Sequence, residues 1–179
     1  MQIDYLDHVP FLFLATLLLI GAAWDLWFHK IPNWLTFPAA ALAITYHSAM
    51  NGFSGLLFSL EGIAVGIAIL LPFYLLGGMG AGDAKLLGAV GGILGPKGVF
   101  AAFLFTALVG GIYALFLLAY HGYLKKTILR YRMMLKTFLL TRNFIYVPPP
   151  AREGKPKLWY GLAIALGTFL SLGLRGRIL

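Results

Sequence analysis

The stretch of residues 62–95, "GIAVGIAILLPFYLLGGMGAGDAKLLGAVGGILG", joins two apolar runs through a glycine-rich turn that holds one acidic residue, Asp83. In each run, two glycines stand four residues apart, a spacing that lets helix backbones approach closely. These pairs are Gly62/Gly66 and Gly88/Gly92. An ionised carboxylate beside hydrocarbon is costly, and such residues usually mark functional sites. The stretch therefore predicts two helices that can each approach a neighbouring helix closely, and a candidate site in the turn between them.

The composition of the whole chain indicates a membrane environment. Of its 179 residues, 60% are hydrophobic and 11% are charged, and the mean hydropathy is +0.86. Soluble domains carry about 25% charged residues. The chain has no cysteine, which excludes disulfides, thiolate zinc sites and cysteine nucleophiles within it. We therefore expect an integral membrane protein.

Six apolar runs divide the chain. They cover residues 9–27, 34–50, 54–77, 84–95, 98–120 and 158–174. A helix needs about 20 residues to cross about 30 Å of hydrocarbon, so the run at 84–95 has to include its flanks. We expect an all-α membrane protein with about six transmembrane helices, in a single domain over residues 1–179. Five helices and a re-entrant segment are the alternative.

The distribution of basic residues predicts the orientation in the plasma (inner) membrane. If the amino terminus is outside, the inner side holds Lys30, Lys85 and nine more Lys or Arg between Lys125 and Lys157. The outer side holds only Lys97, Arg175 and Arg177. An excess of this kind marks the cytoplasmic side. The formal net charge of +8 therefore suits the anionic inner leaflet, and no nucleic acid is expected as a partner.

The inner loop between the fifth and sixth expected helices, residues 121–157, is long and basic. Its part "YLKKTILRYRMMLKTFLL" (123–140) gathers apolar side chains on one helical face and basic side chains on the other. The apolar face holds Leu124, Ile128, Tyr131, Leu135, Phe138 and Leu139, and the basic face holds Lys125, Lys126, Arg130 and Lys136. This pattern predicts an amphipathic helix on the inner membrane surface. The part "VPPPAREGKPK" (147–157) predicts an extended linker.

Three of the six acidic residues lie within or at the ends of apolar runs, namely Asp25, Glu61 and Asp83. Asp25 comes five residues before Lys30, and Asp83 comes two residues before Lys85. Both carboxylates are therefore expected at the same depth, at the inner ends of helices and near water. Glu61 lies toward the outer half of the third helix, where it is either a proton relay or a hydrogen-bonded packing residue.

Two carboxylates at one depth suit an aspartyl hydrolase. Like-charge repulsion separates their proton affinities, so the ionised group can take a proton from water while the protonated one hydrogen-bonds a peptide carbonyl. The structural alternative is a pair of helix-end residues, with Asp83 as an N-cap. Intramembrane acids also serve small proton- or ion-coupled transporters and channel subunits, although transporter sites usually lie near the midplane. An assembly-scaffold relative that has lost its activity is a third possibility.

Gly78, Gly80 and Gly82 alternate immediately before Asp83. Glycine has no side-chain bulk, so another backbone can come close, and a substrate strand beside this loop could be held by main-chain hydrogen bonds. A flexible interhelical turn is the alternative. Lys85 could bind a substrate carboxylate or tune the two acids, or it could extend from a helix end toward water.

The segments "DLWFHKIPNWLT" (25–36), "GGMGAGDAKLLGAVGGILGPKG" (77–98) and "KLWYGLAIALG" (157–167) follow one another along the chain. Together they resemble the type IV prepilin peptidases, the Gly-x-Gly-Asp intramembrane aspartic proteases. The first is similar to an aspartate followed by a basic turn and Ile-Pro-Asn, the second to the Gly-x-Gly-Asp signature, and the third to the last-helix pattern. The chain looks most like the short branch that serves Flp/Tad pili.

The resemblance implies that Asp25 and Asp83 are the catalytic aspartates. It implies a prepilin substrate, cut on the cytoplasmic side just before its apolar helix, and no metal or other cofactor. His29 and His47 have no ligand-like spacing, and we interpret both as structural. Longer family members carry a methylating domain with paired Cys-x-x-Cys zinc motifs. Because this chain has no cysteine, we expect cleavage without methyl transfer.

Overall fold

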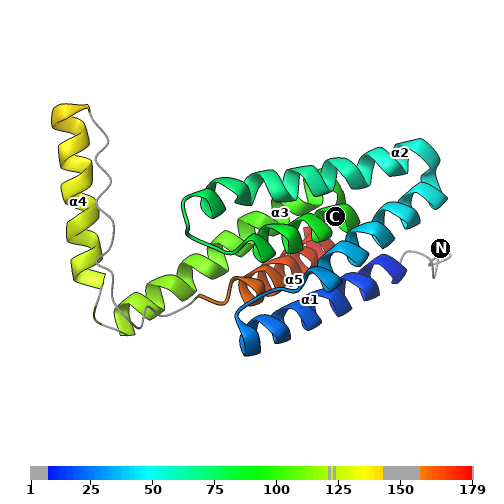
Figure 1. Ribbon diagram of the computed structural model, residues 1–179, viewed down its shortest axis with the longest axis horizontal. Helices are drawn as coiled ribbons and strands as arrows, with labels where there is room; N and C mark the ends of the chain where they lie inside the picture. The colour runs from blue at the N-terminus through cyan, green and yellow to red at the C-terminus, as the bar shows by residue number, and fades with distance from the viewer. Residues whose placement is uncertain (1–7, 121, 123, 143–157, 179) are drawn as a thin grey trace. The chain divides into compact units, whose positions relative to one another are not determined.

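The structure, a computed structural model, describes residues 8–120, 122, 124–142 and 158–178. Within these residues it contains five α-helices and no strand (Figure 1). The helices are α1 (His8–Phe28), α2 (Asn33–Leu75), α3 (Ala81–Tyr120), α4 (Leu124–Thr141) and α5 (Tyr160–Ile178). The prediction of an all-α protein is confirmed for the described residues.

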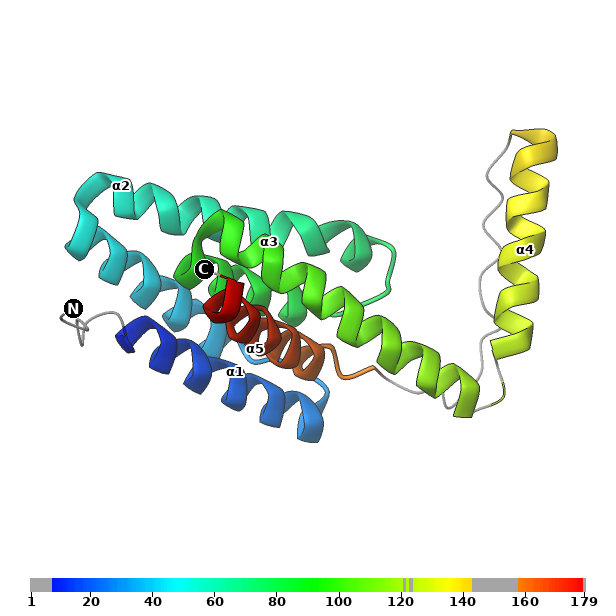
Figure 2. The same ribbon diagram turned by 180° about the vertical axis from the view of Figure 1, so that it is seen from behind.

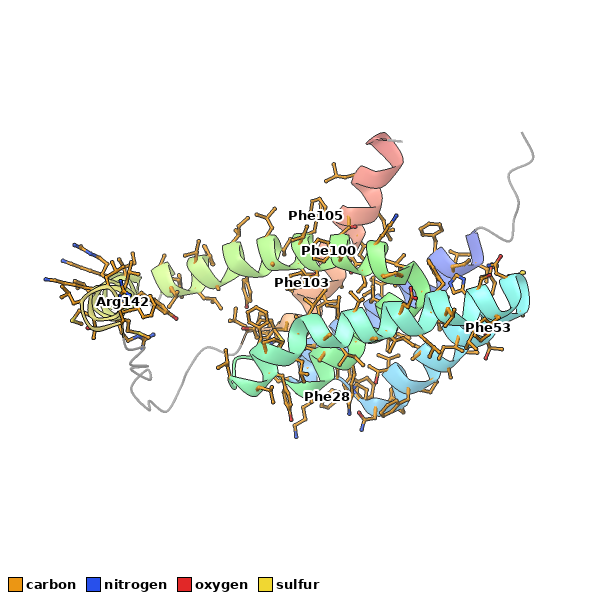
Figure 3. All side chains as sticks on the ribbon, turned by 90° about the horizontal axis from the view of Figure 1, so that it is seen from above. Phe28, Phe53, Phe100, Phe103, Phe105 and Arg142 are labelled. Atoms are coloured by element: carbon orange, nitrogen blue, oxygen red, sulfur yellow. The ribbon has the colours of Figure 1, made fainter. Side chains whose placement is uncertain are left out.

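The two longest helices, α2 and α3, are each interrupted at a glycine. The backbone leaves helical geometry at Gly52 (φ 58°, ψ −137°) and at Gly95 (φ 71°, ψ 178°), and positive φ is accessible to glycine without a steric cost. The chain reverses direction at each of these points (Figure 2). In Figure 3, Phe53 marks the reversal of α2. Each of the six apolar runs in the sequence therefore forms a helical segment of its own.

Three described helices are long and apolar enough to cross a membrane, and they are Val9–Phe28, Asn33–Leu75 and Ala81–Tyr120. The apolar part of α5, Tyr160–Leu174, is shorter. Large apolar side chains on these helices point outward, and Leu12 and Phe53 are 68% and 73% exposed. Extensive exposed apolar surface marks contact with lipid or with another protein. These features agree with a membrane protein, whereas the number of crossings stays a prediction.

The glycine pairs named in the sequence bring α2 and α3 into backbone contact. A methyl group on Gly62 would collide with the backbone of Gly91, and one on Gly66 would lie 2.5 Å from the carbonyl oxygen of Leu87. On the other helix, a methyl group on Gly88 would come within 2.8 Å of Ile67. The prediction that these pairs allow close helix approach is confirmed.

The core of the bundle is formed by α1, α2, α3 and α5, and α5 runs beside α1 and α3 in Figures 1 and 2. Many of the side chains that are essentially inaccessible to solvent come from α1, α3 and α5. They include Leu14, Leu18, Leu86, Leu87, Val90, Val99 and Ile164. Beyond them, α5 packs closely on α3 at Gly167, where a methyl group would collide with the backbone of Thr106. This packing places the start of α5 next to the end of α1 and the start of α3.

The chain divides into two compact units, residues 1–110 with 159–179, and residues 111–158. The second unit holds the end of α3 and α4. Helix α4 confirms the helix predicted at 123–140, and its side chains Lys125, Ile128 and Lys136 are exposed. Its place on a membrane surface stays a prediction, and the predicted linker at 147–157 lies outside the described residues.

Candidate active site

Asp25 lies in the last turn of α1, and its side chain is only 5% exposed. The backbone N–H of Gly161 donates to its Oδ2 atom at 2.8 Å, and the N–H of Leu162 also faces the carboxyl group. Both donors belong to the first turn of α5, where backbone N–H groups have no acceptor within the helix. The positive end of the helix dipole favours a carboxylate there. The start of α5 therefore holds Asp25 in place.

Gly161 leaves no room for a side chain. A methyl group at this position would lie 2.9 Å from Cβ and 3.0 Å from Oδ2 of Asp25. Both distances are shorter than ordinary van der Waals contact, which begins near 3.4 Å. Glycine thus lets the backbone of α5 come within hydrogen-bonding distance of the carboxylate.

Asp83 lies in the first turn of α3, two residues after the helix begins at Ala81, and it is 7% exposed. The N–H of Gly80 donates to Oδ2 of Asp83 at 2.9 Å, and the N–H of Asp83 donates back to the carbonyl oxygen of Gly80 at 3.2 Å. This is the geometry of an acidic residue that reaches back to the start of its own helix. The alternative with Asp83 as the N-cap is wrong in detail, because Gly80 occupies that position.

The fold brings Asp25 and Asp83 together in one buried place. The carboxyl groups of Asp25 and Asp83 lie close enough for their charges to interact, and the hydroxyl group of Tyr160 likewise lies near Asp83. The expectation that the two acids share one depth therefore agrees with the structure. The expectation that both lie near water does not, because neighbouring helices cover both side chains.

Two of the three glycines before Asp83 use their backbone N–H groups within the protein. The N–H of Gly78 donates to the carbonyl oxygen of Phe73 at 2.9 Å, and that of Gly80 is bound to Asp83. A methyl group on Gly82 would lie 3.0 Å from Cβ of Ile31, so this glycine lets α3 approach the loop after α1. Their role in binding a substrate strand stays a prediction.

Lys85 links α3 to the first turns of α2. Its Nζ donates to Oδ1 of Asn33 at 2.9 Å and lies 5.1 Å from the centre of the Phe37 ring. A cation over an aromatic face is attracted by the ring's negative surface. These contacts give Lys85 a structural function, and its role in substrate binding stays a prediction.

The other polar residues considered in the sequence lie elsewhere. Glu61 is exposed on α2, and both the interpretation as a proton relay and that as a hydrogen-bonded packing residue stay predictions. His47 contacts the carbonyl oxygen of Ile93 through Nε2 at 3.1 Å, which confirms a structural role. Among the described residues, no three His, Asp or Glu side chains are grouped so that they could hold a metal ion. The absence of a metal or other cofactor stays a prediction.

Sequence reasoning missed the contribution of residues 159–161 at the start of α5. Trp159 donates to His29, Tyr160 lies near Asp83, and the N–H of Gly161 donates to Asp25. The segment resembled a last-helix pattern, but the group that binds Asp25 is a backbone N–H. Every residue except proline carries such a group, so the sequence does not mark it. A tyrosine following a tryptophan at a helix start was the available signal, and it is a weak one.

Comparison with known proteins shows which family the chain matches. Residues 12–115, more than half of the chain, match the type IV leader peptidase family. A prepilin leader peptidase/N-methyltransferase of Bacillus subtilis (strain 168) is 36% identical over 118 residues, which are 60% of this chain and 44% of that relative. The chain thus spans less than half the length of this curated relative. No solved structure matches the chain.

The matched region contains both acids of the candidate site, together with the glycine-rich turn and the helix pair on either side of it. The two acids of the candidate site thus lie within the region that the family model matches. The chain belongs to the type IV leader peptidase family.

Proposed function

We propose that this chain is an intramembrane aspartic endopeptidase that removes the leader peptide of type IV or Flp prepilins, with Asp25 and Asp83 activating a water molecule. The observation that carries the proposal is the meeting of these two buried carboxyl groups, which come from distant parts of the sequence. The family match and the Bacillus relative, a prepilin leader peptidase/N-methyltransferase, support the substrate class.

The mechanism follows from the way the two carboxyl groups are held. One oxygen of each is bound by a backbone N–H at the start of a helix, which limits rotation of the group. Two like charges in one buried place repel, so the pair shares one proton. The ionised group takes a proton from water as the water oxygen attacks the scissile carbonyl carbon, and the protonated partner hydrogen-bonds the carbonyl oxygen. A proton then passes to the leaving amine nitrogen as the carbon–nitrogen bond breaks.

The proposal includes six membrane crossings, with the site at the cytoplasmic face. The reversals at Gly52 and Gly95 support it, because each turns one long apolar helix into two antiparallel segments. A segment of about 20 residues is about 30 Å long, enough to cross the hydrocarbon. The segment at 81–94 is shorter, about 21 Å at 1.5 Å per residue, and begins at the site itself. The basic residues on the inner side support the orientation.

The proposal also places α4 on the anionic inner leaflet. Its described side chains are largely exposed, and Lys125, Arg132 and Lys136 on it are cationic. Each Lys or Arg near an anionic surface contributes about 1 kcal/mol of attraction. The apolar side chains of the same helix would enter the interface between headgroups and hydrocarbon.

The test is cleavage of a purified prepilin by Asp25→Asn, Asp83→Asn and the double variant. Asparagine keeps the shape and an acceptor for the N–H groups of Gly161 and Gly80, but it has no carboxyl group that could gain or lose a proton. We expect each single change to lower the rate by about 10³-fold or more, and the double change to be no worse, because the two groups act as one unit. Glu61→Gln, the same chemical change at an exposed acid, is the control and should keep most activity.

The wild-type rate should follow a bell-shaped pH profile, since one carboxyl group must be charged while its partner is protonated.

Replacing a charged acceptor by a neutral one weakens a hydrogen bond by about 1 kcal/mol, so the Asn variants should remain folded. Substantial cleavage by a folded single Asn variant would refute the aspartyl mechanism and favour the transporter hypothesis. A wild-type protein that binds a prepilin without cutting it would favour an inactive assembly relative.

A further inference from the structure

A side-chain contact joins the end of α1 to the start of α5. The Nε1–H group of Trp159 donates to Nδ1 of His29 at 3.0 Å, and the two rings lie within 2° of parallel, with centroids 6.0 Å apart. An indole N–H is a donor only, so Nδ1 is the acceptor and the proton of a neutral imidazole lies on Nε2. The contact therefore sets both the orientation and the tautomer of His29.

The backbone around this contact belongs to two helix ends. His29 has a left-handed backbone (φ 52°), which is uncommon outside glycine and persists where the surroundings hold it. Its N–H donates to the carbonyl oxygen of Asp25 at 2.9 Å and so completes the last turn of α1. On the other side, the carbonyl oxygen of Trp159 accepts from the N–H of Ala163 at 3.2 Å and begins α5.

Both helix ends also hold Asp25. This residue lies one turn before His29, and its Oδ2 accepts from Gly161, two residues after Trp159. The hydrogen bond from Trp159 to His29 and that from Gly161 to Asp25 therefore join the same two helix ends. Together with the backbone of the last turn of α1 and the first turn of α5, they form a closed ring of contacts. Moving the start of α5 away from α1 would stretch both bonds together.

We propose that His29 and Trp159 are positioning residues, which hold the start of α5 against α1 so that Gly161 keeps Asp25 oriented for cleavage. This inference rests on the proposed function, in which Asp25 is one of the two catalytic acids. A catalytic group displaced by about 1 Å can lose about 100-fold in rate. Because the contact acts on Asp25 and not on the substrate, its loss lowers kcat and leaves KM unchanged.

Three substitutions distinguish the effect of losing the hydrogen bond from the effect of changing the size of the rings. Trp159→Phe removes the donor, and His29→Phe removes the acceptor, while both keep an aromatic ring. His29→Asn keeps an acceptor near the position of Nδ1, and asparagine tolerates a left-handed backbone. His47→Phe is the matched control, because it removes a histidine contact to the carbonyl oxygen of Ile93.

The experiment measures kcat and KM for prepilin cleavage and the thermal unfolding midpoint of every variant. We expect Trp159→Phe and His29→Phe each to lower kcat by about 10- to 100-fold with KM within about 2-fold. The double variant should be no worse than the single ones, because both remove the same bond. His29→Asn should recover kcat to within about 3-fold of wild type, and His47→Phe should keep its kcat.

Several outcomes would overturn the inference while the proposed function stands. They are full kcat in folded His29→Phe and Trp159→Phe, an equal loss in His47→Phe, or a His29→Asn variant no better than His29→Phe. If His29→Phe does not fold, Trp159→Phe and His29→Asn decide. A wild-type protein that does not cleave, or an Asp25→Asn variant that does, overturns the proposed function and this inference with it.

Discussion

Adding one methyl group at Gly161 tests whether the start of α5 sets the geometry of Asp25. In Gly161→Ala, the new Cβ would lie 2.9 Å from Cβ, 3.0 Å from Oδ2 and 3.2 Å from Cγ of Asp25. Ordinary contact begins near 3.4 Å, so the two groups must separate by roughly 0.5 Å or more. Whether the carboxyl group or the first turn of α5 moves, the 2.8 Å hydrogen bond from Gly161 lengthens.

The size of the effect follows from this displacement. A misplacement of about 1 Å costs about 100-fold in rate, so a shift of half that size should lower kcat by about 10- to 100-fold. This loss corresponds to about 1.4–2.7 kcal/mol in the activation free energy. Overpacking lowers the free energy of unfolding by about 1–3 kcal/mol, partly offset by the better helix propensity of alanine. The variant should therefore stay folded, with an unchanged KM.

The assay is single-turnover cleavage of a prepilin in lipid nanodiscs, together with the thermal unfolding midpoint. Gly173→Ala is the matched control, because it lies in the same helix and its new methyl group would meet no atom within 4 Å. A folded Gly161→Ala variant with kcat within about 2-fold of wild type would refute the reasoning. An equal loss in Gly173→Ala would also refute it, since the effect would then belong to α5 in general.

Gly91→Ala should lower the free energy of unfolding by about 2–3 kcal/mol, because its methyl group would collide with the backbone of Gly62, which no side-chain movement can relieve. Gly111→Ala in the same helix, where nothing lies within 4 Å, should not destabilise the protein in the same unfolding measurement, and equal effects would contradict the packing argument. Spin labels along α4 (Leu124–Thr141) should show lipid exposure with a period of about 3.6 residues, whereas uniform water exposure would contradict its place on the inner leaflet. The 179-residue chain, supplied with S-adenosylmethionine, should release a cleaved pilin without an added methyl group, and mass spectrometry of the product would reveal one if this expectation is wrong.

The sequence by itself determined the class of the protein and the pair of acids. Hydrophobicity and charge are properties of single residues that add up along a chain, so the six apolar runs and the basic segments between them are visible without any fold. Asp25 and Asp83 are conspicuous because charge is costly beside hydrocarbon. The glycine pairs also predicted a close contact, since four-residue spacing places small residues on one helical face.

Only the tertiary structure decided what surrounds those acids. Every helix start offers unpaired backbone N–H groups, so sequence cannot say which carboxyl group will meet which donor. The packing of α5 against α1 assigns Gly161 to Asp25 and Trp159 to His29, although 136 and 130 residues separate the partners. The same packing buries both acids, which local position at helix ends had placed near water. Burial and partner choice are set by segments distant in sequence, and for that reason they emerge only when the helices are packed together.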